Sequence, residues 1–193
     1  MLVGYDGDDL ILRSETEQRR AESYRRFTRS WERGGRWSMV ALPPGVLPAS
    51  ATAGEVVRAV EDARTSIGRD GVMRTLDAAV ARWPADPLVL FASADEAYAR
   101  GDPDAAINRY RSLTVLDPDH LAARNNLASL LLARGCADSA ERAFGDAGGD
   151  ALAPEVAPQI AAAVKDTAAR IARARADSRP ADTMAGDEAP RCP

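Results

Sequence analysis

Apolar side chains between residues 52 and 147 recur at steps of three and four positions, which is the period of a helix that buries one face. Within 103–116 this stripe consists of Ala106, Ile107, Tyr110 and Leu113. Asp-Pro pairs at 86–87 and 102–103 place a capping carboxylate before a first-turn proline. Gly101 can take the left-handed backbone conformation that ends a helix. The pattern therefore predicts a series of amphipathic helices.

The same block repeats itself at an interval of 34 residues. The pairs that share this interval are Gly101 and Gly135, Ala106 and Ala140, Tyr110 and Phe144, and Pro84 and Pro118. A weaker first copy begins at a T-x-x-E capping box formed by Thr52 and Glu55. We therefore expect three units of two helices each, at about 52–86, 87–120 and 121–147.

The segments beside the repeats have a different composition. Prolines and a glycine within 43–48 break regular structure, so 43–51 is expected to be a linker. An amphipathic helix at 154–176 is expected to cover the exposed end of the stack. Its apolar side comprises Ile160, Val164, Ala168 and Ile171. Residues 177–193 have almost no apolar anchor and are expected to form a disordered tail.

Residues 1–42 do not follow the repeat. Two short apolar runs, 1–5 and 10–14, flank an Asp-Gly turn and predict a hairpin. An aromatic stripe then predicts a helix that ends at Gly34 and Gly35. The stripe consists of Tyr24, Phe27 and Trp31. A final strand at 37–42 completes the order strand, strand, helix, strand, which is marginal as a domain of its own because it buries little area.

Composition limits the function. The chain has 193 residues, 46% of them hydrophobic, which is enough to form a core. A net charge of -4 and a pI of about 5.1 leave no overall basic field for a nucleic acid backbone. The apolar stretch 127–133, interrupted only by Ser129, is too short to cross a bilayer, and the N-terminus lacks the pattern of a signal peptide. The sequence taken by itself therefore predicts a cytoplasmic protein with no membrane span.

The residues that could carry chemistry are few. Cys136, Cys192 and the single His120 are too few for a disulfide scaffold or a structural zinc site. His120 is expected at the start of a helix and Cys136 past its end, roughly 20 Å apart, so they cannot form a catalytic dyad. We interpret them as a solvated turn residue and a small helix-end residue. We expect no catalytic residue, metal or cofactor in this chain.

Charged residues near the N-terminus also have simple interpretations. The aspartates Asp6, Asp8 and Asp9 lack the later glutamate of a calcium loop and fit a solvated hairpin turn. Eight arginines stand against four glutamates within 13–36. A solvated helix face explains this excess more simply than a site for anions or membranes does.

The segment from Gly101 to Tyr110, Gly-Asp-Pro-Asp-Ala-Ala-Ile-Asn-Arg-Tyr, followed by Leu-Asp-Pro at 116–118, resembles the tetratricopeptide repeat. The residues that define the repeat here are Gly101, Ala106, Tyr110, Pro118, Leu127, Gly135, Ala140 and Phe144. Leu90 and Arg124 stand where the family usually has tryptophan. The resemblance implies a mainly α fold, a solenoid of antiparallel helix pairs preceded by the small N-terminal β-hairpin, helix and strand.

The same resemblance implies a non-catalytic protein-protein interaction module, because the first helix of each pair lines a concave groove in this family. The residues at the usual contact positions are Phe91, Asp95, Tyr98, Asn125, Ser129 and Leu132. An extended peptide or an amphipathic helix fits such a groove. The set of lysines and arginines with which some relatives bind a C-terminal carboxylate is absent from these positions. An open alternative is that the aromatic rings pack against the N-terminal segment.

The first 45 residues resemble the end of a bacterial papain-like cysteine peptidase domain, of the type that processes bacteriocin leaders and is followed by a tetratricopeptide array. The residues that carry this likeness are Gly4-Tyr5-Asp6, Leu10 to Ser14, Trp31, Gly35-Arg36-Trp37 and Leu42 to Gly45. The likeness implies that the nucleophilic cysteine and the histidine would lie upstream of Met1, with Ser14 where an orienting Asp or Asn is usual.

Three hypotheses follow. The chain is a non-catalytic binding protein that carries a truncated remnant of a peptidase-like domain, or it is the downstream part of an active cysteine peptidase that is exported as a longer product. The third, weaker one is that the strand 1–5 pairs with another copy, since unpaired strand edges invite association.

Overall fold

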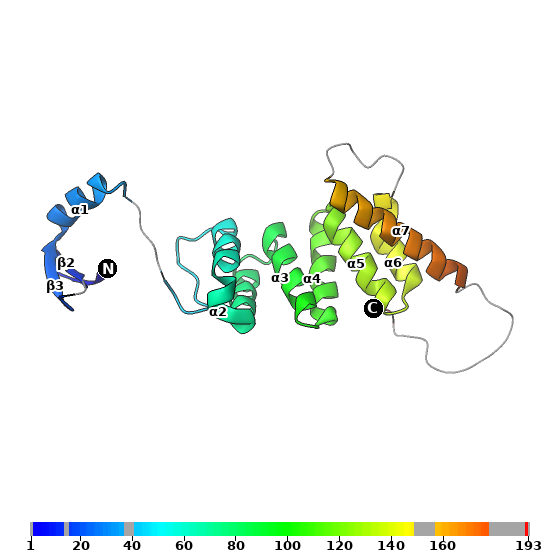
Figure 1. The fold of residues 1–193 in the computed structure, drawn as a ribbon, viewed down its shortest axis with the longest axis horizontal. Coiled ribbons are helices and arrows are strands. Elements are labelled where there is room, and N and C mark those ends of the chain that lie inside the picture. The colour runs from blue at the N-terminus through cyan, green and yellow to red at the C-terminus, as the bar shows by residue number, and fades with distance from the viewer. Residues whose placement is uncertain (1, 14–15, 37–40, 149–156, 178–191, 193) are drawn as a thin grey trace. The chain divides into compact units, whose positions relative to one another are not determined.

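The computed structural model describes residues 2–13, 16–36, 41–148, 157–177 and 192 (Figure 1). It contains two compact units, Met1–Ala41 and Leu42–Pro193. The chain is mostly helical and carries one small antiparallel sheet near its N-terminus, so the expected fold class is confirmed.

The first unit consists of a three-stranded sheet and one helix. Its elements are β1 (Leu2–Asp6), β2 (Asp9–Leu12), β3 (Arg20–Ser23) and α1 (Tyr24–Arg33). The strands are antiparallel in the order β1-β2-β3, and Asp6 pairs with Asp9 across a turn in which Gly7 has a φ of 58°. Among the side chains described in this unit, Leu10 is the one buried hydrophobic residue, and α1 buries none.

The third strand lies in a different place from the one predicted. The expected strand at 37–42 lies largely outside the described residues, and Ala41 and Leu42 have no strand conformation. The sheet instead takes Arg20–Ser23, which precedes α1. This strand has mostly exposed side chains and is held by backbone pairing with β2, so no apolar alternation marks it in the sequence.

The second unit is a stack of helices. Its elements are α2 (Ala53–Arg82), α3 (Pro87–Ala99), α4 (Pro103–Leu116), α5 (Leu121–Ala133), α6 (Ala137–Phe144), the 3-10 turn η1 (Gly145–Gly148) and α7 (Pro158–Asp177). Gly68, with a φ of 63° and a ψ of 173°, divides α2 into two helical arms. These arms form the first pair, and α3 with α4 and α5 with α6 form the next two (Figure 1).

Local signals set the helix ends. Thr52 Oγ1 accepts a hydrogen bond from the Glu55 amide at 3.3 Å, and Glu55 Oε2 accepts one from the Thr52 amide at 2.9 Å. The two bonds confirm the predicted capping box. The bond from the Thr52 amide, together with one from the Thr52 hydroxyl to the same carboxylate, lowers the pKa of Glu55. The side chains of Asp86 and Asp102 cap α3 and α4 in the expected way, each accepting from a backbone amide at 3.0 Å.

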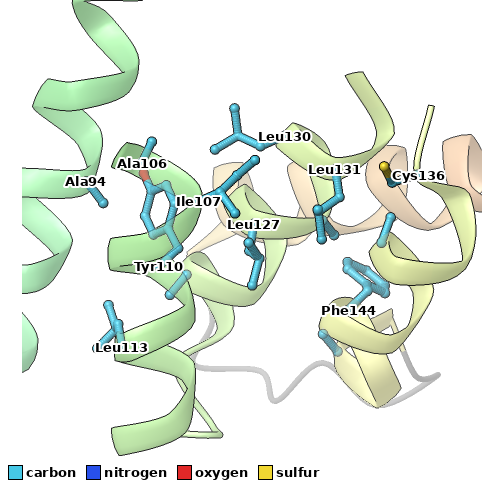
Figure 2. Packing of buried hydrophobic residues seen from close by; sticks show 14 of the residues in the cluster. Ala94, Ala106, Ile107, Tyr110, Leu113, Leu127, Leu130, Leu131, Cys136 and Phe144 are labelled. Carbon is cyan, nitrogen blue, oxygen red and sulfur yellow. The ribbon is translucent and has the colours of Figure 1, made fainter. Parts of the chain in front are cut away.

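The repeated residues form the core. Ala106, Ile107, Tyr110 and Leu113 of α4 are buried, and Ala106 and Leu113 have no exposed surface. Figure 2 shows Ile107 of α4 directed toward Leu127 of α5. The ring of Tyr110 meets Phe91 of α3 edge-on. The corresponding positions one interval later, Ala140 and Phe144, are also buried, while Pro118 is exposed in the turn before α5. Alanines at the contact let the helices approach closely.

A disulfide joins Cys136 to Cys192, which are 56 positions apart. The interpretation of Cys136 as an isolated helix-end residue is therefore incomplete. It does precede α6 and is 2% exposed, but it is also a cross-link to the C-terminal end of the chain. Two cysteines are too few for a scaffold of several bridges, and they still suffice for one. The predicted tail lies outside the described residues except for Asp177, the last residue of α7, and Cys192.

None of the helices in the described ranges combines the length and apolar character that crossing a membrane requires.

Candidate protein-interaction surface

The predicted groove residues fall into two groups with different surroundings. On α3, Asp95 and Tyr98 are exposed, and Tyr98 keeps 60% of its surface accessible. On α5, Asn125 is 9% exposed, and Ser129 and Leu132 are partly buried. The structure therefore presents the α3 positions to solvent and covers much of the α5 positions.

Asp95 is held in place by two neighbouring helices. The Tyr110 hydroxyl of α4 donates a hydrogen bond to Asp95 Oδ1. The Asn126 amide of α5 donates to the same oxygen at 3.5 Å and to the Tyr110 oxygen at 3.1 Å. Because three helices meet in this network, the Asp95 carboxylate has a fixed position beside the exposed ring of Tyr98.

The surroundings of Asp95 disfavour its negative charge. Desolvation raises the pKa of this carboxyl above its usual range, and the nearby charge of Glu61 raises it further. The hydrogen bonds from Tyr110 and Asn126 act in the opposite direction but do not cancel these effects. Burial is also the largest cause of the raised pKa of Tyr110, followed by its hydrogen bond to Asp95. A cationic group placed next to Asp95 would therefore stabilise the charged form.

The first arm of α2 supplies the adjoining charges. Arg64 bonds Glu61 at 2.7 Å and Glu96 of α3 at 2.5 Å, and Glu96 is 2% exposed. The Arg64 guanidinium thus forms ion pairs with two carboxylates. We define the central face as Glu61, Arg64, Asp95, Tyr98 and Asn126. With Glu96 included, it carries three carboxylates and one guanidinium.

Three residues of the central face were missed by sequence reasoning. Glu61 and Arg64 lie one repeat interval of 34 before Asp95 and Tyr98, so the periodicity did contain a signal for them. Asn126 is adjacent to the predicted Asn125, and the structure turns Asn126 toward Asp95. Its role depends on the rotation of α5 against α4, which residue spacing alone does not determine.

Phe91 is part of the packing between repeats. Its ring stacks on His120 with centroids 5.1 Å apart and meets Tyr110 edge-on at 5.9 Å. His120 Nδ1 accepts a hydrogen bond from the Ala123 amide at 3.2 Å and so caps α5. The interpretation of His120 as a solvated turn residue is therefore wrong, because its ring packs and its nitrogen is bonded.

Helix α7 accounts for the covering of α5. Ser129 and Thr167 share a hydrogen bond at 3.1 Å, and Leu132 packs against the core cluster that contains Val164 and Ile171. The buried residues of α7 are Val164, Thr167 and Ile171. Of the predicted apolar stripe, Val164 and Ile171 are buried and Ile160 is 39% exposed. The predicted capping helix thus lies against the last pair, although its expected first residues, 154–156, lie outside the described ranges.

Two shallow hollows lie away from the central face. One, of about 490 Å³, is lined by Ile67, Gly68, Arg69, Asp70 and Arg100 around the bend in α2. Asp70 and Arg100 form an ion pair there at 2.7 Å. The other, of about 440 Å³, is lined by Pro84, Ala85, Arg111, Ser112, Val115 and Leu116. Neither includes a predicted groove residue or a residue of the central face.

His120 and Cys136 do not form a catalytic pair. Cys136 is bonded to Cys192, and the His120 nitrogen that accepts a bond caps α5. Within the described ranges, no group of three His, Cys, Asp or Glu side chains is placed to hold a metal ion.

The comparisons with known proteins agree with the repeat. The sequence model of the tetratricopeptide repeat family matches residues 97–171. No curated protein matches the chain in sequence. Among solved structures, the type III secretion translocator chaperone SycD of Yersinia enterocolitica is similar, with a TM-score of 0.56 and 16% identity over 69% of this chain and 90% of that one. A structure of SycD in complex with a peptide of the translocator YopD gives a TM-score of 0.56 and 15% identity over 68% of this chain and all of that one. At these identities the likeness concerns the fold.

Proposed function

We propose that this chain is a non-catalytic binding protein that recognises a short segment of a partner protein on its central face. The observation that carries the proposal is the exposed ring of Tyr98, fixed next to a carboxylate that three helices hold in place. Exposed aromatic side chains beside ordered polar groups are typical anchors of protein interfaces. The structure of SycD with a YopD peptide supports the proposal, since a chain of similar fold binds a peptide.

The chemistry of the central face defines the segment. An apolar side chain would pack on Tyr98, and a basic side chain would lie next to Asp95 and Glu61, because three carboxylates share one guanidinium on this face. Arg64 is already bound by Glu61 and Glu96 and so does not offer a free site for a terminal carboxylate. The proposed ligand is therefore an internal extended or helical segment with adjacent apolar and basic residues.

An array of 15-residue peptides that vary apolar and basic positions tests this proposal. The full chain is expected to select peptides with both features, and Tyr98→Ala or Asp95→Asn should weaken their binding at least tenfold. Tyr5→Ala and Asp8→Asn are matched controls, because they remove an exposed ring and an exposed carboxylate from the other unit. Peptides that bind all four variants as well as the wild-type chain would refute the proposed surface. Phe91→Ala is unsuitable, because that ring packs against His120 and Tyr110.

The second candidate function is that of a cysteine peptidase part, which would mean that the first unit is a piece of a peptidase domain. The observation in its favour is the β1–β2 hairpin, which turns at Gly7 and Asp8, directly after the Gly-Tyr-Asp segment that ends β1. Because the likeness puts the nucleophilic cysteine and the histidine before Met1, the test is a fluorogenic peptide assay on a product extended upstream to include an in-frame Cys and His. Turnover by that product that iodoacetamide abolishes would favour the peptidase, and absence of such codons or of turnover is expected for the binding protein.

The first unit also offers two strand edges, β1 and β3, for pairing with a second copy. Sedimentation of the full chain at several concentrations tests this further proposal. A monomer at every concentration would exclude it.

A further inference from the structure

Helix α7 contacts α5 at a position whose counterpart on α3 belongs to the central face. Ser129 occupies the same position in its repeat as Asp95 does in the preceding one, 34 residues earlier. Asp95 stays exposed on the central face although Tyr110 and Asn126 donate to it, whereas Ser129 is partly buried and bonds Thr167 of α7 at 3.1 Å. Figure 1 shows α7 beside α5 and α6. The surface that is open on α3 is therefore occupied on α5 by a segment of the same chain.

The contact between α7 and α5 is small and partly polar. Of the 20 residues of α7, three are buried, and one of these is Thr167. The ion pair of Arg175 with Glu141 joins two side chains that are about half exposed, so it adds little. Such a helix depends on packing, and this packing rests mainly on Val164 and Ile171.

Helix α5 also carries an unsatisfied polar atom. Asn125 lies one helical turn before Ser129, is 9% exposed, and its Oδ1 has no hydrogen-bond partner among the described residues. A buried acceptor without a donor disfavours the arrangement that buries it. A peptide backbone amide could supply that donor.

The disulfide restrains α7 from its far side. The closed loop from Cys136 to Cys192 contains α6, η1 and α7, so α7 is connected to the last repeat at both of its ends. Breaking the bridge leaves only the connection through η1. A single tether allows more open conformations than a closed loop does, and it lowers the effective concentration of α7 at α5.

We propose that α7 is an intramolecular ligand of α5, retained by the Cys136–Cys192 disulfide and released when that bridge is reduced. Release frees Ser129 from Thr167 and extends the central face onto the last repeat, where Asn125 and Leu132 occupy the other groove positions. A dithiol reductant donates two electrons and two protons, the sulfur-sulfur bond breaks to give two thiols, and the reductant becomes a disulfide. The regulatory role rests on the proposed function, while the release of α7 does not.

Hydrogen exchange of the full chain, read by mass spectrometry, tests the release. The oxidised protein, the protein reduced with dithiothreitol, and Cys192→Ser are compared. Amide exchange in α7 is expected to be at least tenfold faster in the reduced and variant proteins, with α3 and α4 unchanged. Dithiothreitol should not alter Cys192→Ser further. Equal exchange in α7 of oxidised and reduced protein would overturn the proposal.

A labelled peptide with the sequence of residues 157–177 tests whether α7 behaves as a ligand. It is expected to bind reduced full-length protein at least tenfold more tightly than oxidised protein. Ile171→Asp should release α7 without reduction and permit binding, whereas Ile160→Asp, at an exposed position of the same helix, should not. Faster exchange without peptide binding would refute the ligand role. Neither readout uses Tyr98, so failure here is separable from failure of the proposed function.

Discussion

Replacing Tyr110 with phenylalanine removes the hydroxyl that joins α4 to α3 and α5. This hydroxyl donates to Asp95 Oδ1 and accepts from Asn126 at 3.1 Å, while the ring itself is 1% exposed and keeps its packing in the variant. A hydrogen bond to a charged partner contributes about 1.5–3 kcal/mol. Because Asp95 is partly open to water, we expect the lower end, a loss of about 1–2 kcal/mol in the free energy of unfolding.

Urea denaturation of Tyr110→Phe, Asp95→Ala and the double variant measures this interaction. The cycle should give a coupling of about 1 kcal/mol, since the two groups share one bond. The hydrogen bond from Tyr110 lowers the pKa of Asp95, so that pKa should rise further in Tyr110→Phe, which carboxyl NMR can follow. Tyr98→Phe is the control, because its ring is 60% exposed and a change within about 0.5 kcal/mol is expected. A coupling near zero would refute the network as a link between repeats.

Three further predictions concern stability and are measured by urea denaturation. Leu113→Ala removes a side chain with no exposed surface and should lower the free energy of unfolding by about 3 kcal/mol. Val115→Ala, at a position that is 79% exposed, should lower it by less than about 0.5 kcal/mol. Equal losses would contradict the assigned core. Gly101→Ala places a side chain at a φ of 81° and should cost about 1 kcal/mol, while Gly54→Ala, in the first turn of α2, should be neutral or stabilising. Because folding raises the pKa of Asp95, the native state binds this proton more tightly than the unfolded state does. The contribution of this carboxyl to the free energy of unfolding therefore falls as pH rises through the acidic range. The free energy of unfolding of Asp95→Asn relative to wild type should therefore increase from about pH 3 to about pH 7, and a decrease would contradict the sign of the shift.

The helix pairs could be predicted from the sequence because their signals are local. The caps at Thr52, Asp86 and Asp102 and the glycine at 101 act within a few residues of the helix ends they define. The apolar stripe of α4 is periodic and becomes buried as expected. Such features need no knowledge of distant parts of the chain.

The features that escaped prediction depend on distant or non-periodic contacts. Strand β3 is selected by backbone pairing with β2, and its side chains carry no alternation. The bond between Cys136 and Cys192 spans 56 positions and leaves no local pattern. The division of the candidate site into an open part on α3 and a covered part on α5 depends on how α7 packs, which its own amphipathic pattern does not specify.

The size of the exposed surface also limits the length of the segment that can bind. The central face extends over the first arm of α2, α3 and Asn126 of α5, which are neighbours in the stack. If neighbouring helix axes are roughly 10 Å apart, this face spans about 20 Å. An extended chain covers that distance with about six residues and a helix with about thirteen. Release of α7 would add the α5 positions to this face and so lengthen the segment that can bind. The Cys136–Cys192 bridge would then control both the length of the partner segment that is bound and the affinity for it.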